Sequence, residues 1–328
     1  MKLATLRSSD PKNRNGELIV VSKDHARAVR PEPSRCRTLL EATERWKDVG
    51  PYLEARYQAL NEGKATGSFA LNLNECLAPL PNSPGFYDGS AFLSHVFRAR
   101  KARGDEMPES AKKTPLMYQG VSDNLLPFNA PIELMDPAFG GDFEGELGVI
   151  TSDIPKGTPA ADVGKHIILF TLLNDITFRV LVIPELETKF GFLQSKPNSS
   201  FAPLVISPDE FGDLWDGQRV STELHVKLNG ETFGKPNARE MHFSFSELVA
   251  HACRTRPLSG GSIVGCGTIS NEDKNKGFAC LTEKRFQEIM DTGKAVTPWL
   301  KAGDRVWMEM YDKEGRSLFG PIDEVVSV

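Results

Sequence analysis

The run from Gly141 to Ile150, GDFEGELGVI, constrains the fold of this chain more than any other segment. It places an acid at every second position, Asp142, Glu144 and Glu146, and then becomes apolar. In an extended strand these three side chains point to the same face, where their charges repel one another unless water or a cation separates them. The pattern leaves two interpretations open: a solvated edge of a sheet, or a site for a hard divalent cation that takes oxygen ligands.

Size and charge narrow the class of protein. The chain has 328 residues and a formal net charge of −5, with its charges spread out and no long basic run. This predicts one large domain with a small appendage and argues against a nucleic-acid partner. No long apolar stretch and no signal-peptide pattern occurs, so we expect no membrane span. The five cysteines lie far apart without a zinc-like pair, which predicts reduced thiols and a cytoplasmic location.

Residues 1–82 are predicted to form a small N-terminal domain. Helical periodicity runs over 37–62 with a break at Gly50-Pro51, and a proline-rich stretch that begins at Pro79 marks the boundary. The strands expected in this domain are 2–6, 17–22 and the strand-like segment 68–77.

Residues 83–328 are predicted to form a large domain of mixed structure. This part is dense in glycine, proline and short β-branched runs, and it has few long helical patterns. The expected strands are 145–150, 221–229, 262–267, 305–311 and 317–326. The expected helices are 89–103, 165–174, 243–255 and 281–293. Because strands outnumber helices, we expect an α+β fold whose large domain has a mainly β core.

Several polar residues are ambiguous when each is taken alone. Asp175 follows the apolar run 167–173, so its carboxylate needs a hydrogen bond, an ion partner or a metal. Arg179, four residues later, would be its simple helical ion partner. The charge run that contains Arg98, Arg100, Lys101 and Arg103 is typical of a solvated face.

The other candidates have equally plain interpretations in isolation. His95 lies among apolar residues, as a core histidine does, and Asp88 suits the cap of a helix. Lys196 is typical of a solvated loop lysine, and Glu283 of a surface helix acid.

The order of these residues resembles the fumarylacetoacetate hydrolase family over about residues 83–328. The resemblance rests on separate motifs that agree in order: Asp88-x6-His95, Tyr118-Gln119-Gly120, Asp142 to Leu147, Asn174-Asp175-x3-Arg179, Lys196-Pro197, Gly267-Thr268-Ile269-Ser270, Leu300 to Val306 and Phe319 to Ile322. The first 82 residues resemble the small leading domain of that family more loosely. The resemblance implies a fumarylacetoacetase-like large domain with a β-roll or sandwich architecture.

The resemblance also implies a role for each matching residue. The implied ligands of Mg²⁺ or Ca²⁺, with Mn²⁺ as a further candidate, are Asp88, Glu144, Glu146 and Asp175. Asp142 belongs to the motif without being a direct ligand. His95 matches the general base and Glu283 the acid that orients it, if one residue is inserted after Thr268. Lys196 matches the cation beside the metal site and Arg179 the arginine near the oxyanion, while Tyr118 and Thr268 match residues that contact the carboxylate end of the substrate.

This chain departs from the family pattern at two positions. Val182 stands where a glutamine follows the arginine in the animal enzyme, and valine cannot donate a hydrogen bond. Ser90 stands two residues after Asp88 in place of a tyrosine, although Tyr87 is adjacent. Both changes concern the substrate rather than the metal or the base.

The implied activity is metal-dependent hydrolysis of a carbon–carbon bond in a β-diketone acid. The first expectation is fumarylacetoacetate, cleaved to fumarate and acetoacetate in the degradation of tyrosine by way of homogentisate. The same scaffold also hosts acylpyruvate and fumarylpyruvate hydrolases, 2-oxo acid decarboxylases and isomerases. A metal-binding protein without catalysis is a third interpretation. The implied partners are a small dione acid and a second copy of the chain in a homodimer.

Overall fold

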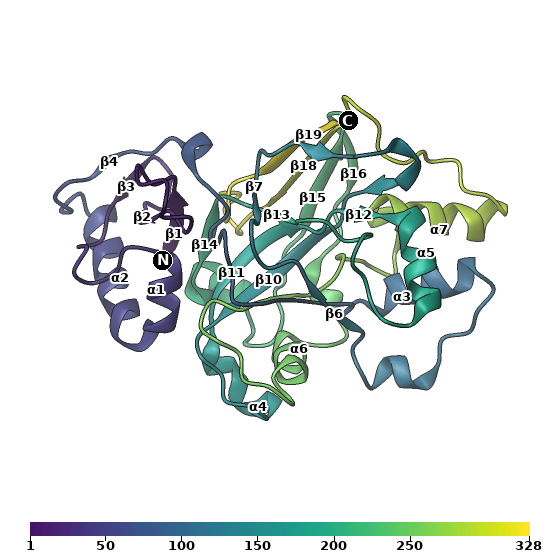
Figure 1. Cartoon of the computed structure of the whole chain (residues 1–328), viewed down its shortest axis with the longest axis horizontal. Coiled ribbons are helices and arrows are strands. Elements are labelled where there is room, and N and C mark those ends of the chain that lie inside the picture. Colours follow the sequence, from purple (N-terminus) through teal and green to yellow (C-terminus); the bar gives the residue numbers. More distant parts are fainter.

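Two β-sheets packed face to face form the centre of the molecule, and the computed structural model describes residues 1–328 (Figure 1). The main sheet has twelve strands. They are β1 (Lys2–Leu6), β2 (Glu17–Val21), β3 (Arg27–Val29), β4 (Phe69–Ala70), β5 (Phe86–Gly89), β6 (Met117–Gly120), β7 (Leu126–Pro127), β10 (Gly145–Thr151), β11 (Ile167–Asn174), β13 (Ser200–Phe201), β14 (Leu204–Ile206) and β17 (Ile263–Gly265). Their order along the main path is β4-β3-β2-β1-β14-β11-β10-β17-β5-β6, with β13 and β7 beside it.

The second sheet has five strands in the order β16-β15-β18-β19-β8. They are β8 (Ile132–Glu133), β15 (Leu224–Leu228), β16 (Glu231–Gly234), β18 (Arg305–Met310) and β19 (Ile322–Ser327). A short pair, β9 (Gly141–Asp142) and β12 (Thr177–Phe178), completes the strands. The helices are α1 (Leu39–Glu44), α2 (Trp46–Asn61), α3 (Leu93–Ala102), α4 (Ala160–Val163), α5 (Arg179–Thr188), α6 (Phe245–Ala252) and α7 (Leu281–Thr292). None of them combines the length and the apolar character needed to cross a bilayer.

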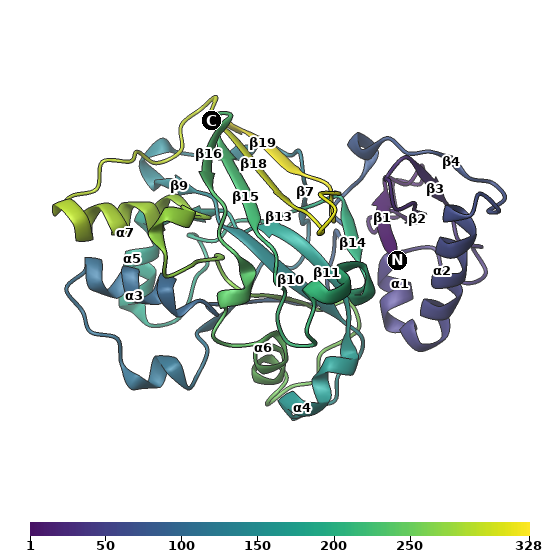
Figure 2. The ribbon, with the colours of Figure 1, turned by 180° about the vertical axis from the view of Figure 1, so that it is seen from behind.

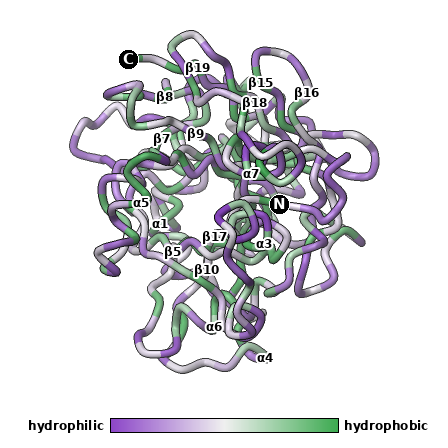
Figure 3. The backbone as a smooth tube through the Cα atoms, turned by 90° about the vertical axis from the view of Figure 1, so that its right-hand side faces the viewer, coloured by the Kyte–Doolittle hydropathy of each residue, from purple (hydrophilic) through white to green (hydrophobic).

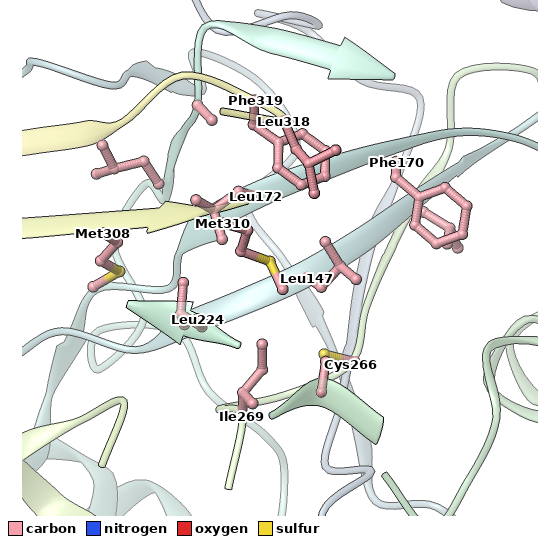
Figure 4. Packing of buried hydrophobic residues seen from close by; sticks show 14 of the residues in the cluster. Leu147, Phe170, Leu172, Leu224, Cys266, Ile269, Met308, Met310, Leu318 and Phe319 are labelled. Carbon is pink, nitrogen blue, oxygen red and sulfur yellow. The ribbon is translucent and has the colours of Figure 1, made fainter. Parts of the chain in front are cut away.

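The main core lies between the two sheets. Leu147 of β10 and Leu172 of β11 meet Leu224 of β15 and Met310 of β18 there, and all four side chains are fully buried (Figure 4). Apolar surface removed from water in this way supplies most of the driving force for folding. The strands that carry the polar site residues are therefore fixed in a packed interior.

The first 82 residues form a smaller unit whose strands continue the main sheet. β1 pairs antiparallel with β14, at Leu3 opposite Val205, and α1 and α2 lie on the far side of this unit (Figures 1 and 2). A second core joins the two parts, because Leu3 and Leu53 pack in one cluster with Leu173. The α+β class with a mainly β large part is confirmed.

Three local expectations were wrong. The segment 165–174 is not a helix but the central strand β11, buried along its whole length; an apolar run of this length fits either element, and pairing with β10 decides it. The break in the helical region falls at Arg45, while Pro51 lies inside α2. Of the segment 68–77 only Phe69–Ala70 is a strand, because Asn72 caps a short 3₁₀ turn.

Candidate active site

The candidate site is a cavity of about 380 Å³ at the end of the main sheet that lies away from the N-terminal unit. Helices α3, α5 and α7 gather at this end (Figures 1 and 2), and Figure 3 looks onto it, with the strands β5, β10 and β17 behind. The wall contains Asp88, Glu144 and Glu146 together with His95. Acids from β5, from β10 and from the residue just before β10, with a histidine from a helix, therefore open onto one space.

Three carboxylates that are far apart in the sequence converge in this wall. Asp88 on β5, Glu146 on β10 and Asp175 after β11 each offer an oxygen, and these oxygens lie within 4.8 Å of one another. The parallel pairing of β5 with β17 sets Asp88 opposite Gly265. All three side chains are buried. The structure thus brings together three of the four residues predicted to bind the metal.

Burial and mutual repulsion govern how these acids ionise. Burial, followed by the charge of Asp175, raises the pKa of Asp88 to about 7. Burial, followed by the charges of Asp88 and Asp175, raises the pKa of Glu146 well above its ordinary value. Both oxygens of Glu146 are buried without a hydrogen-bond partner. Bare carboxylate oxygens in a buried cluster are suited to coordinate a hard divalent cation.

Glu144, the fourth predicted ligand, lies beside the cluster and is held by cationic side chains. Its oxygens are 2.6 Å from Nζ of Lys196 and 2.7 Å from Nη2 of Arg179. Lys196 Nζ also lies 2.5 Å from Oδ2 of Asp175. Burial disfavours the charge on Glu144, but Arg179 and Lys196 outweigh it and hold the pKa of Glu144 well below its ordinary value. Lys196 therefore joins Glu144 to the carboxylate cluster.

The charge of the site fits a divalent cation. Five carboxylates, that of Asp142 included, face two permanent cations, Lys196 and Arg179. When all seven groups are ionised, three negative charges remain, and a divalent cation reduces this excess to one. The ion would be held by Asp88, Glu146 and Asp175, with Glu144 next to them, and it would act as a Lewis acid that polarises a bound carbonyl oxygen.

The backbone leaves room for this site by means of a glycine. A Cβ atom on Gly265 would overlap Oδ1 of Asp88 and would lie 3.2 Å from Oε2 of Glu146. We expect Gly265→Ala to weaken Mn²⁺ binding by about 10–100-fold while the protein stays folded, because the methyl group displaces two ligands. Calorimetric titration with Mn²⁺ measures the change. Gly164→Ala, where the new Cβ meets only Ser246 Oγ at 3.9 Å, is the control, and equal affinity in both variants would contradict this assignment of ligands.

The raised pKa of Asp88 predicts how stability depends on pH when divalent cations are removed. The folded protein keeps the proton of this carboxyl up to about pH 7, whereas the unfolded chain releases it near pH 4. The folded state then binds more protons between these values, so its free energy of unfolding falls as the pH rises, by at most about 1.4 kcal/mol per pH unit from this group. Thermal melts of chelator-treated protein between these pH values measure the slope. Asp88→Asn should have the smaller slope, and identical slopes would contradict the prediction.

A histidine and a buried acid form a second feature of the site. Nδ1 of His95, on α3, lies 3.5 Å from Oε2 of Glu283, on α7. Neither atom has another hydrogen-bond partner, and Glu283 is fully buried. His95 lines the cavity, so its other ring nitrogen, Nε2, is the one available for chemistry. A histidine oriented by a carboxylate in this way is suited to act as a general base.

The residues predicted to contact substrate also line the cavity. The Tyr118 hydroxyl donates to Oδ2 of Asp175 at 2.7 Å, and the Thr268 hydroxyl donates to Oε1 of Glu144 at 2.7 Å. Val182 forms part of the wall, so the missing side-chain donor leaves an apolar surface there. Tyr87 does not line this cavity, and it borders a separate pocket behind Tyr118.

The structure corrects two expectations from the sequence, one about the partner of Asp175 and one about the exposure of Arg98. Asp175 pairs with Lys196 rather than with Arg179, because Asp175 precedes α5 and is not part of a helix. Arg98, expected on a solvated face, is only 4% exposed and pairs with Glu283 at 2.8 Å. The arginine-rich composition of that helix gave no sign of a partner in α7.

Asp142 shares the motif but has a different role from the other acids. Its carboxylate accepts hydrogen bonds from the amides of Leu281 and Thr282, at the start of α7, and from Nε of Arg179 at 2.8 Å. A carboxylate at a helix N-terminus is favoured by the helix dipole. Asp142 therefore anchors α7 and Arg179, and its absence from the ligand set stays a prediction.

Comparison with known proteins places the chain in a family. Residues 86–326 match the family description "Fumarylacetoacetate (FAA) hydrolase C-terminal". Residues 1–82 match "Fumarylacetoacetase N-terminal domain 2". The chain belongs to the fumarylacetoacetate hydrolase family.

The proteins to which the chain is similar are named for different activities. The chain is 24% identical over 247 residues to an oxaloacetate tautomerase of Bacillus subtilis, covering 73% of this chain and 71% of that protein. It shares the fold of a fumarylacetoacetate hydrolase from Exiguobacterium antarcticum, with a TM-score of 0.67, 16% identity and coverage of 100% and 99%. A fumarylpyruvate hydrolase of Pseudomonas aeruginosa, solved with Mn²⁺ and pyruvate, is similar with a TM-score of 0.55, 14% identity and coverage of 75% and 90%.

Proposed function

We propose that this protein is a metal-dependent hydrolase that cleaves a carbon–carbon bond in a β-diketone acid, with fumarylacetoacetate as the first candidate. One observation carries the proposal: Asp88 and Glu146, which cluster with Asp175, line the same cavity as a histidine that faces a buried glutamate. The first group suits a divalent cation such as Mg²⁺, Ca²⁺ or Mn²⁺, and the second suits the activation of water.

The reaction adds water across the bond that breaks. His95, oriented by Glu283, would take a proton from water, and the hydroxide would add to the ketone carbon. Lys196 and Arg179 would stabilise the oxyanion that forms, a contribution of roughly 3–4 kcal/mol for each donor in comparable sites. The carbon that leaves takes up the proton, which gives one carboxylic acid and one ketone-containing acid. The divalent cation would supply Lewis-acid stabilisation of the enolate.

The outer part of the cavity suits an anionic, partly apolar substrate. Arg100 and Arg103 line it on the side of α3, and Leu186 and Phe192 line it beside Val182. Arginine is well suited to carboxylate recognition because its guanidinium binds two oxygens at once. We infer that these arginines receive the carboxylate of the substrate that lies farther from the metal.

A second candidate function follows from Val182. If the donor missing at this position is needed for fumarylacetoacetate, the substrate is instead an acylpyruvate such as fumarylpyruvate, or the reaction is decarboxylation or isomerisation of a 2-oxo acid. The name of the Bacillus subtilis relative, an oxaloacetate tautomerase, supports isomerisation of a 2-oxo acid as an alternative reaction.

The test supplies purified protein with fumarylacetoacetate, fumarylpyruvate and oxaloacetate and identifies the products by NMR. We expect fumarate and acetoacetate from the first substrate, with Mg²⁺ or Mn²⁺ present and not after chelation. Asp175→Asn should abolish turnover. Exclusive turnover of fumarylpyruvate or oxaloacetate would transfer the proposal to the second candidate, and metal binding without any turnover would reject both. The implied homodimer stays a prediction, which light scattering of the same protein can test.

A further inference from the structure

Arg98 is a buried arginine one helical turn after His95 on α3. Only 4% of it is exposed. Its guanidinium donates to acceptors on α7 and on the segment before it. Nη1 donates to Oε1 of Glu283 at 2.8 Å, Nε to Oε1 of Gln287 at 3.0 Å, and Nη2 to the carbonyl oxygen of Glu272 at 2.9 Å. A planar guanidinium bound on three sides is held in one orientation.

The two oxygens of Glu283 have different surroundings. Oε1 receives Nη1 of Arg98 and the hydroxyl of Ser270. Oε2 has no hydrogen-bond partner and faces Nδ1 of His95 at 3.5 Å. Since a carboxylate is planar, donors that fix Oε1 also fix the direction of Oε2. Arg98 and Ser270 together therefore aim the free oxygen at the imidazole.

Burial makes a cation beside Glu283 necessary. Glu283 is fully buried, and an unpaired charge in that environment is strongly unfavourable. Without Arg98 the carboxylate of Glu283 would turn toward another donor. Oε2 would then no longer accept a hydrogen bond from Nδ1 of His95, and the tautomer with Nε2 free to act as a base would lose its support.

We propose that Arg98 is a positioning residue of the His95–Glu283 pair, which keeps Oε2 of Glu283 turned toward Nδ1 of His95. The inference rests on the proposed function, because it assigns His95 the role of base. The competing explanation is structural: Arg98 simply fastens α3 to α7. The two explanations differ in what they predict for the imidazole.

The first test compares Arg98→Met with Arg98→Lys and with Lys101→Met, a control that removes an exposed charge from the same helix. We expect Arg98→Met to lower kcat about 10–100-fold with KM and Mn²⁺ affinity within about twofold of wild type. Arg98→Lys should recover part of the loss, because an ammonium group keeps the charge without the fork. A KM or metal-affinity change as large as the kcat change would support the structural explanation and overturn the proposal.

A cavity behind the helix allows chemical rescue. An open space of about 600 Å³, lined by Arg98, Phe97, Met107, Gln287 and Met290 among others, lies between α3 and α7. Arg98→Ala would extend this space to Glu283, so guanidinium ions at a concentration that does not unfold the protein should enter and raise kcat, whereas sodium ions at equal concentration should not. Equal effects of both ions would count against the proposal.

A spectroscopic readout separates this inference from the proposed function. The chain has six histidines, and ¹H–¹⁵N NMR with His95→Asn as the assignment variant identifies the ring nitrogens of His95. We expect a protonated Nδ1 in wild type and its loss in Arg98→Met. An unchanged Nδ1 signal would overturn the inference even if kcat fell. If wild type turned over no dione acid, the proposed function would fail, and this signal would still decide whether Arg98 holds the pair.

Discussion

Replacing His95 with asparagine is expected to lower kcat by about 10²–10⁴-fold and to leave the affinity for a divalent cation unchanged. General-base catalysis by a positioned side chain is worth about this factor. His95 faces Glu283 and not the carboxylates of the metal cluster, so its loss should not disturb the ligands. Asparagine is smaller than histidine but polar, which limits the change in packing on α3.

The measurement is steady-state turnover with saturating Mg²⁺, combined with calorimetric titration of Mn²⁺. His225→Asn serves as the control, because that histidine lies on β15 and is not part of the cavity lining. A variant that retains most of its activity would show that the reaction needs no activated water. Such a result would favour decarboxylation on the same site, in which the metal stabilises an enolate and no water adds.

Replacing Glu146 with glutamine should have effects of opposite sign on binding and on stability. The change removes a ligand, so the affinity for Mn²⁺ should fall by more than the about 10–100-fold typical of changes around a metal's ligands, and turnover should be lost. In chelator-treated protein, however, it removes a charge that burial and the neighbouring Asp88 and Asp175 disfavour. The amide can also donate to those carboxylates. We expect the unfolding midpoint of the metal-free variant to rise by about 2–4 °C.

Differential scanning calorimetry with and without Mg²⁺ tests both signs together. Wild type should gain stability when the cation is added, because a ligand that binds only the folded state stabilises it, whereas Glu146→Gln should gain little. Glu187→Gln, at an exposed position of α5, controls for loss of a charge. A lower midpoint of Glu146→Gln without metal would mean that Glu146 has a stabilising partner in the folded protein and would contradict the prediction.

The sequence was most informative where several motifs had to agree. The order of Asp88, Glu146 and Asp175 among the other motifs predicted the family, which is confirmed, and the structure brings these three acids within 4.8 Å of one another. Neither spacing nor periodicity could supply that distance, because it depends on β5, β10 and β11 lying in one sheet through β17. The catalytic roles of the residues stay predictions.

Local patterns failed where a distant partner decides the outcome. The run 167–174 is apolar at nearly every position and suits a helix or a buried strand, and only the neighbouring strands β10 and β14 select the strand. Arg98 belongs to a charge run whose other members are partly or fully exposed, and its burial depends on Glu283, which lies 185 residues away in the chain. Such partners are invisible in a single sequence.

The position of Asp142 couples the two parts of the candidate site, the carboxylate cluster and the His95–Glu283 pair. This carboxylate binds the first amides of α7, the helix that carries Glu283, and it also binds Arg179, while its chain neighbours Glu144 and Glu146 face the metal cluster. Glu283 and two of the acids predicted to bind the metal are thus attached to the same five-residue stretch of backbone. A small shift of that segment would move both together and preserve the distance between Glu283 and the acid cluster. Changes in the surrounding loops are therefore expected to leave these two parts of the site aligned with each other.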